Sequence, residues 1–278
     1  METTSLLIEG GGMRGFFSAG VLQCLLDNNI NIPYVIGVSS GSLNAVGYVN
    51  HNLQSLFSNA QFSGKRFIQL KNLRHPEKGI LDIDRFFQPA KAEFLELKRS
   101  DTVLKVATTR AKDAKLIYWE KSDFRSPEDM VLKLRASAAI PVLMPKTIID
   151  KTVYVDGGIM DSIPIKQAIA DGKTKHIIIV TRLKGYRKGP QGLEFFLLKW
   201  LEPYPQLKEA MLTRHIRYNQ TMDKLEKMEA AGEVIIIRPV MNRLRRVDYN
   251  MRKFRNTYDD GYLITRQEIS RIRVFLNL

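Results

Sequence analysis

The chain has 278 residues, of which 44% are hydrophobic and 26% charged, a composition that is typical of a globular protein and excludes an intrinsically disordered chain. Forty-three Lys and Arg residues against 29 Asp and Glu residues give a net charge of +14, which favours an anionic partner, either a lipid surface or nucleic acid. The single cysteine, Cys24, excludes an internal disulfide, and its apolar neighbours predict a buried thiol.

The N-terminal residues carry an early acid and too short an apolar run for a secretory signal peptide. No stretch of the sequence approaches the ~20 apolar residues that a membrane-spanning helix requires. We therefore expect a cytoplasmic protein whose contact with membranes is at most peripheral.

The opening of the chain predicts a strand, a glycine-rich loop, a helix and a second strand. A short apolar run from Ser5 to Ile8 is typical of a buried strand, and the apolar stretch from Phe16 to Asn28 predicts a helix. The apolar run that begins at Tyr34 and ends in Gly37–Ser40 predicts the second strand. Strand, helix and strand in this order favour a parallel sheet covered by helices, and therefore an α/β fold.

The loop between the first strand and the helix contains Gly10, Gly11, Gly12 and Gly15. Its spacing matches a dinucleotide-binding loop, but such a loop requires an acid about 20 residues later, and the second strand ends without one. Nucleotide binding is therefore disfavoured. Backbone N–H groups at the start of a helix instead suit a developing oxyanion, and Arg14 adds a positive charge nearby.

Ser39 lies at the centre of a Gly-x-Ser-x-Gly turn that follows the second strand. Small, helix-compatible residues come after it, and Gly37 and Gly41 flank it where a Cβ would meet neighbouring backbone. This context predicts a nucleophile elbow, in which a strained turn presents the serine hydroxyl. An ordinary glycine-serine turn between a strand and a helix is the alternative, and motifs elsewhere in the chain are needed to distinguish the two.

Further strands and a carboxylate follow. Two runs, Thr102–Arg110 and Lys115–Glu120, predict adjacent strands, and a helix is expected from Pro127 to Ala136. A strand from Lys151 ends at Asp156, where open α/β sheets bind ligands, although an Asp-Gly turn is common on its own. Between these regions, the apolar segment from Gly79 to Phe87 either lines a cleft or, as is more usual, packs in the core.

The last part of the chain is basic. A buried strand is expected at 175–181, then a long helical pattern at 207–230, a strand at 233–239 and a final helix from about Asp259. Basic residues near Phe195, Phe196 and Trp200 fit either a face that meets anionic lipid or a buried aromatic cluster under a solvated surface. No recognition motif supports a specific nucleic-acid partner.

Four motifs in this order resemble the patatin-like phospholipase family: the loop Gly10–Gly15, the elbow Gly37–Gly41, the segment Ala136–Pro141, and Asp156 with the two glycines after it. The resemblance covers about residues 5–182, which we expect to form the catalytic domain. Residues 183–278 are expected to be a basic, mainly helical extension that packs on the same domain and adds the strand near 233–239.

The resemblance implies a three-layer α/β/α sandwich with a mostly parallel sheet, and a Ser-Asp dyad that needs no metal or other cofactor. Ser39 would be the nucleophile and Asp156 the base. The amides of Gly10, Gly11 and Gly12 would hold the oxyanion, with Arg14 supporting the loop. None of the four histidines, His51, His75, His176 and His215, stands in a context that resembles a triad histidine.

The function implied is that of a serine lipid acyl hydrolase, which cleaves carboxylic esters of phospholipids or other acyl lipids through an acyl-enzyme. Two alternatives stay open: an acyltransferase, and a catalytically silent lipid-binding module. Contact with an anionic membrane surface is a possible partner interaction, and the sequence leaves the oligomeric state open.

Overall fold

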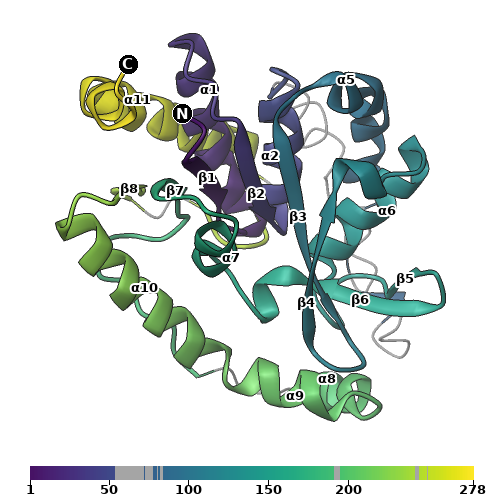
Figure 1. Cartoon of the computed structure of the whole chain (residues 1–278). Helices are drawn as coiled ribbons and strands as arrows, with labels where there is room; N and C mark the ends of the chain where they lie inside the picture. The colour runs from purple at the N-terminus through teal and green to yellow at the C-terminus, as the bar shows by residue number, and fades with distance from the viewer. Residues whose placement is uncertain are drawn as a thin grey trace.

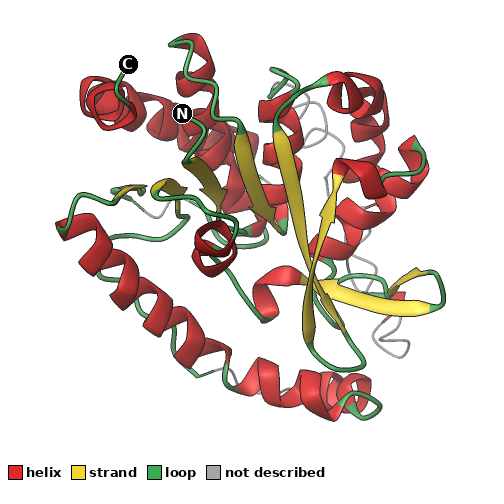
Figure 2. Ribbon diagram, in the orientation of Figure 1, coloured by secondary structure: helices red, strands yellow, loops and turns green. Residues whose placement is uncertain are grey.

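A central sheet lies between two layers of helices (Figures 1 and 2). The computed structural model describes residues 1–53, 72, 78–79, 81, 84–190, 195–241, 244–248 and 250–278, without the side chains of residues 84, 85, 195 and 196. The described strands are β1 (Thr4–Ile8), β2 (Tyr34–Val38), β3 (Val103–Arg110), β4 (Lys115–Glu120), β5 (Thr147–Ile149), β6 (Thr152–Asp156), β7 (Lys175–Ile179) and β8 (Val234–Ile237).

The described α-helices are α1 (Gly15–Asp27), α2 (Ser40–Val49), α4 (Asp84–Phe87), α5 (Phe94–Arg99), α6 (Pro127–Ala138), α7 (Ile165–Ala170), α8 (Phe195–Leu201), α9 (Pro205–Leu212), α10 (Arg214–Ala230) and α11 (Met251–Leu276). Short 3₁₀ turns η1 (Gly12–Arg14), η5 (Gln88–Glu93), η6 (Lys121–Asp123) and η7 (Gly157–Ile159) connect several of them.

The sheet is mixed and mostly parallel, as predicted. Its strand order is β5-β6-β3-β2-β1-β7-β8, and β4 pairs with β3. Strands β3, β2, β1, β7 and β8 are parallel to one another, whereas β4, β5 and β6 form antiparallel pairs. The parallel part is buried on both faces, as sheets built from crossover connections usually are.

The two faces of the sheet pack against different helices because successive side chains of a strand point to opposite sides. Leu6 and Ile8 of β1 belong to a core cluster with apolar residues of α1, α2, α6 and α11. Leu7, between them, packs with residues of α7 and α10. Each of the three is fully buried, which contributes about 1.5–3 kcal/mol per side chain.

The C-terminal part of the chain extends both the sheet and one helical layer. Strand β8 pairs in parallel with β7, and α11 lies along α1 (Figure 1). The two helices approach so closely that a Cβ on Gly20 would stand 1.9 Å from the carbonyl oxygen of Tyr258, and one on Gly261 would stand 2.2 Å from that of Phe17. Glycine at both positions is therefore required for this crossing.

Two helix expectations were wrong. Helix α11 begins at Met251 and not near Asp259, because Asn250 caps it by accepting a hydrogen bond from the amide of Lys253. The pattern at 207–230 is two helices, α9 and α10, separated at Thr213, whose hydroxyl donates to the carbonyl of Glu209. Strand β5 had not been expected.

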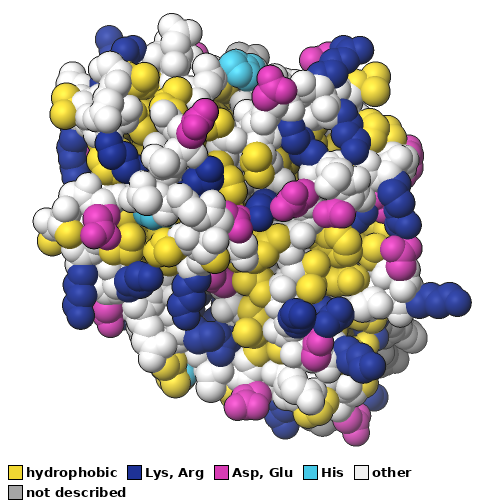
Figure 3. Space-filling view, viewed as in Figure 1, with side chains coloured by type: hydrophobic (Ala, Val, Ile, Leu, Met, Phe, Trp, Pro, Cys, Tyr) yellow, Lys and Arg dark blue, Asp and Glu magenta, His cyan; other side chains and the backbone are white. Residues whose placement is uncertain are grey.

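Trp200 is buried, with 6% of its surface exposed, and packs on Tyr204 with ring centroids 5.5 Å apart. It therefore belongs to a buried aromatic cluster and not to a lipid-facing surface, whereas the side chains of Phe195 and Phe196 lie outside the described residues. On the face shown in Figure 3, basic side chains are spread among acidic and apolar ones. No helix in the described ranges has both the length and the apolarity needed to cross a bilayer.

Candidate active site

The topology of the sheet brings Ser39 and Asp156 together. Strand β2 runs parallel to β3 and ends with Val38 opposite Ala107. Strand β6 runs antiparallel to β3 and ends with Asp156 opposite Thr108. Because β4 occupies the other edge of β3 over these residues, β2 and β6 share one edge and meet end to end. Ser39 and Asp156 consequently line the same crevice.

Ser39 has the strained backbone of an elbow. Its φ of 55° and ψ of −126° place it in a region that costs a non-glycine residue about 1–3 kcal/mol. A Cβ on Gly37 would lie 2.5 Å from the carbonyl oxygen of Gly41, and one on Gly41 would lie 2.4 Å from that of Ile8. The two glycines therefore let the chain turn sharply between β2 and α2.

Ser137, in α6, holds this turn in place. Its hydroxyl donates to the carbonyl of Ala107, 2.6 Å away, and accepts the backbone N–H of Ser39 at 2.9 Å. The hydroxyl of Ser42 lies 2.8 Å from it and must be the donor, because the hydrogen of Ser137 is already engaged. The sequence had indicated only a tight loop of small residues beginning here.

The glycine loop closes over Ser39. A Cβ on Gly10 would lie 2.6 Å from the Cβ of Ser39, so only glycine fits. The amide of Gly11 donates to the hydroxyl of Ser40 at 3.0 Å. Gly12 has a φ of +59°, and among the described residues no acceptor is found for its amide. Of the three predicted oxyanion donors, the amides of Gly10 and Gly12 are thus without an acceptor among the described residues, and that of Gly11 is engaged.

Arg14 is buried, but its side chain makes no hydrogen bond to the loop. It lines a separate cavity on the side of the crevice, and its Nε has no partner among the described residues. Burial, together with the positive charge of Arg182, lowers the pKa of Arg14 to about 10.

Asp156 is held at the end of β6 with 5% of its surface exposed. Its Oδ1 accepts the amide of Gly158 at 2.7 Å, and its own amide donates to the carbonyl of Ala139. Arg214, the first residue of α10, donates from Nε to the carbonyl of Gly158. Burial lowers the pKa of Arg214, and the negative charge of Asp156 opposes that shift.

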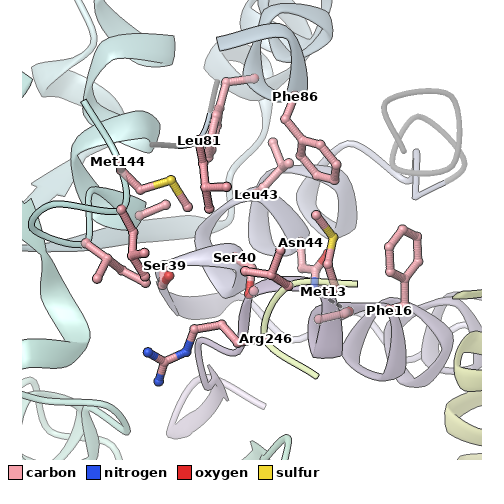
Figure 4. Close-up of a pocket in the computed structure, with 17 residues that line it drawn as sticks. Met13, Phe16, Ser39, Ser40, Leu43, Asn44, Leu81, Phe86, Met144 and Arg246 are labelled. Atoms are coloured by element: carbon pink, nitrogen blue, oxygen red, sulfur yellow. Dashed lines mark hydrogen bonds between the residues drawn. The ribbon is translucent and has the colours of Figure 1, made fainter. Parts of the chain in front are cut away.

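An apolar pocket adjoins the crevice, with about 810 Å³ of empty space when the open solvent at its mouth is included. Figure 4 shows Ser39 beside Met144, with Leu43, Leu81 and Phe86 further along, whereas the guanidinium of Arg246 points away from the apolar side chains. Leu81, Phe86 and Phe87 come from the segment for which both a cleft and a core role had been considered. Residues 80, 82 and 83 of that segment lie outside the described residues.

Sequence reasoning missed Arg214 and Arg246, which also line the crevice. The carbonyl of Arg246 accepts the amide of Met13 at 3.0 Å, and a Cβ on Gly12 would lie 2.4 Å from that carbonyl oxygen. The segment before α11 is therefore packed directly on the glycine loop. Neither arginine stands in a motif, so no local signal marked them.

Among the described residues, no histidine lines the crevice. His176 is buried and lies 2.8 Å from the hydroxyl of Ser5, and burial lowers its pKa to about 4. His75 lies outside the described residues. The described residues also contain no group of three or more His, Cys, Asp and Glu side chains that could hold a metal ion.

Relatives by sequence were found in bacteria, fungi and a virus. The uncharacterized protein YjjU of Escherichia coli is 27% identical over 64% of this chain and 51% of its own length. Lysophospholipase NTE1 of Candida albicans is 23% identical over 94% of this chain and 19% of its own length. The probable lipid hydrolase 463L of Invertebrate iridescent virus 6 is 26% identical over 64% of this chain and 70% of its own length. The chain thus spans about half the bacterial relative and about a fifth of the fungal one.

The crystal structure of VipD from Legionella pneumophila has the same fold, with a TM-score of 0.52 at 13% identity over 98% of this chain and 67% of that one. A domain of unknown function, DUF6363, matches residues 204–277. The family model of patatin-like phospholipases matches residues 6–169, a range that contains the glycine loop, the elbow and the strand that ends at Asp156. The chain therefore belongs to the patatin-like phospholipase family of hydrolases.

Proposed function

We propose that the chain is a serine lipid acyl hydrolase that uses Ser39 and Asp156 as a dyad. The observation that carries the proposal is that both residues line one crevice, which the glycine loop borders and an apolar pocket adjoins. The names of the Candida and viral relatives, lysophospholipase and probable lipid hydrolase, support an acyl lipid as the substrate.

In the first half of the reaction, the hydroxyl oxygen of Ser39 attacks the ester carbonyl while Asp156 accepts its proton. The carbon–oxygen bond to the alcohol then breaks, and the alcohol leaves with that proton. In the second half, Asp156 takes a proton from water, the hydroxide attacks the acyl-enzyme, and the fatty acid leaves as Ser39 regains its hydrogen. No other reactant is needed.

The negative charge that develops on the carbonyl oxygen requires donors fixed in advance. The amides of Gly10 and Gly12, for which no acceptor is found among the described residues, are the candidates, and the positive charges of Arg214 and Arg246 border the same crevice. The amide of Gly11 can take part only if the hydroxyl of Ser40 releases it. The acyl chain would lie in the apolar pocket, which buries it from water.

The dyad is tested with Asp156→Asn and a matched control, Asp161→Asn. Asp161 follows in the same loop, and burial raises its pKa to about 6, but it does not line the crevice. We expect Asp156→Asn to abolish turnover of a short-chain p-nitrophenyl ester, and Asp161→Asn to retain most of it. Equal losses in both variants, or loss in a folded His→Ala variant with Asp156→Asn still active, would contradict the assignment.

The substrate class is tested by mass spectrometry of total lipid extract incubated with wild type and with Ser39→Ala. Fatty acid and deacylated lipid should accumulate only with wild type, and identical spectra would exclude a lipid hydrolase. Failure of a fluorophosphonate to label Ser39 would favour the silent binding module. Transfer of the acyl group to an added alcohol or lysolipid, in preference to water, would favour the acyltransferase.

We also propose that the chain meets its lipid at an anionic membrane surface, which its net charge of +14 would attract. Sedimentation with vesicles of phosphatidylglycerol should exceed that with phosphatidylcholine alone and should decline as salt is added. Equal sedimentation with both kinds of vesicle would contradict this proposal.

A further inference from the structure

A second cavity, with about 840 Å³ of empty space when the open solvent at its mouth is included, lies beside the proposed catalytic crevice and differs from it in its lining. Its basic side chains are Arg14, Arg182, Lys188, Arg214 and Arg246. The one carboxylate in the lining, that of Glu9, accepts the amide of Thr181 at 2.6 Å and its hydroxyl at 3.0 Å. The cavity therefore has a strong excess of positive charge.

None of the five basic side chains forms an ion pair with a described carboxylate. The guanidinium of Arg182 lies over the ring of Tyr186, 4.4 Å from its centroid, and the ammonium of Lys188 lies 4.1 Å from the centroid of Tyr218. Arg14 is 8% exposed, and its Nε has no partner within the described ranges. The cations also repel one another, and the carboxylate of Glu9 offsets only part of the lowering of the pKa values of Arg14, Lys188 and Arg214.

The pKa values of two of these side chains are lowered, as expected for clustered positive charges. Burial lowers the pKa of Lys188 to about 7, and the positive charge of Arg214 adds to the shift. Burial and the charge of Arg182 likewise lower the pKa of Arg14. A dianionic group in the cavity would reverse both effects, because opposite charge favours the protonated form.

The basic cavity adjoins the proposed catalytic site. Gly10, Arg214 and Arg246 line both the crevice and the cavity, while Ser39 and Arg246 line both the crevice and the apolar pocket. Arg246 stands where the three spaces meet. An ester whose acyl chain fills the apolar pocket, with its carbonyl at Ser39, would consequently direct its alcohol part toward the basic cavity.

We propose that the basic cavity binds the phosphate group of the alcohol part, so that the preferred substrates are acyl esters carrying a terminal phosphate monoester. This inference rests on the proposed hydrolase function and narrows its substrate class. Guanidinium groups match phosphate oxygens with paired, charge-assisted hydrogen bonds. A head group that ends in a quaternary ammonium would instead add a cation to five others.

The inference also assigns a role to the region after the family domain. Arg214 and Arg246 lie in the stretch that matches the domain of unknown function, and Arg182 and Lys188 precede it. The family domain itself contributes Arg14 from the glycine loop. Head-group recognition would thus be built largely by the C-terminal part of the chain, against a catalytic centre built by the N-terminal part.

The test compares kcat/KM for 1-oleoylglycerol 3-phosphate with that for 1-oleoylglycerol, which lacks only the phosphate. We expect wild type to favour the phosphate ester by at least about tenfold, the worth of one charge-assisted hydrogen bond. Arg182→Gln and Lys188→Gln should each lower this ratio about tenfold. The control Lys227→Gln removes the same charge from the exposed surface of α10 and should keep the wild-type ratio. A wild-type ratio near one, or a ratio that the two cavity variants leave unchanged, overturns the inference.

Binding to Ser39→Ala separates this inference from the hydrolase proposal. The variant should bind 1-oleoylglycerol 3-phosphate at least about tenfold more tightly than 1-oleoylglycerol, whether or not wild type is active. Absence of fluorophosphonate labelling would defeat the hydrolase proposal alone, and equal binding would defeat the phosphate site alone. Inorganic phosphate should raise KM for the phosphate ester. If inorganic phosphate binds wild type but not Arg182→Gln while the ratio of kcat/KM between the two esters stays near one, the cavity binds free phosphate, and its assignment to the head group of the substrate is wrong.

Discussion

The hydroxyl of Ser137 is the point at which the elbow is tied to the sheet, and its removal gives a sharp prediction. Ser137→Ala deletes three hydrogen bonds at once: one to the carbonyl of Ala107, one from the amide of Ser39 and one from the hydroxyl of Ser42. Ser137 is fully buried, so the three partners would be left without water or protein to replace it.

The magnitude follows from the cost of an unsatisfied buried polar group, about 1–3 kcal/mol. With each of the three groups at the lower end of that range, because the vacated space lets the neighbours relax, Ser137→Ala should destabilise the protein by about 3 kcal/mol. Ser18→Ala is the matched control. Ser18 is also fully buried, but its hydroxyl has no partner among the described residues, so its removal should cost almost nothing.

Urea unfolding of wild type and both variants checks the prediction. The midpoint for Ser137→Ala should fall by about 1 M, whereas that for Ser18→Ala should stay near wild type. The rate of fluorophosphonate labelling at Ser39 should drop at least about tenfold in Ser137→Ala alone, since the nucleophile loses its backbone anchor. Equal stability losses in the two variants would refute the reasoning, because the loss would then come from burial and not from hydrogen bonding.

Three further predictions concern packing and protonation. Gly20→Ala should destabilise by about 2–3 kcal/mol in urea unfolding, because its Cβ would stand 1.9 Å from the carbonyl oxygen of Tyr258, and this clash outweighs the ~1 kcal/mol gain in helix propensity. Burial lowers the pKa of His176 to about 4, so between about pH 6.5 and pH 4 the unfolded chain binds a proton that the folded chain does not. The free energy of unfolding should therefore fall by up to about 3 kcal/mol as the pH falls from about 6.5 to about 4, and His176→Gln should remove this pH dependence. Burial and the charge of Arg214 lower the pKa of Lys188 to about 7, so the preference for the phosphate ester should decline from about pH 7 to about pH 8.5, where the phosphate is already dianionic, and the decline should be smaller in Lys188→Gln.

Much of the fold was predictable because its strands are short apolar runs with clear ends. Strand β2 begins at Tyr34, as expected from sequence, and β4 has its expected bounds, Lys115–Glu120. The start of α11 was missed because its cap, Asn250, lies in a basic segment with no apolar periodicity. The close crossing at Gly20 was invisible for another reason: a glycine in a helix indicates neither which partner approaches nor how closely.

The candidate site was predictable where its residues stand in motifs. Ser39 and Asp156 could be proposed from sequence because a strained turn and a strand end leave local patterns, and the pairing of β3 with both β2 and β6 brings the two residues together. Ser137 lies in one of the recognised motifs, but its structural role could not be predicted, because its three hydrogen bonds depend on where α6 packs. The support expected from Arg14 for the loop was not found as a side-chain hydrogen bond, and its guanidinium lines the basic cavity.

The net charge of +14 does not indicate where in the fold the charged side chains lie. Summed over the sequence, it favoured an anionic partner, either a lipid surface or nucleic acid, and both interpretations place the charge on the outer surface. The fold instead turns part of it inward, because β7 ends beside β1 and carries Arg182 toward Arg14, while α10 and the segment before α11 add Arg214 and Arg246. These residues are far apart in the sequence and form no charge run. Isolated charges on the surface cost little free energy, whereas cations clustered in one cavity repel one another and, where buried as Arg14 is, also lose hydration. The clustered cations are therefore the part of the net charge for which an anionic ligand should be sought.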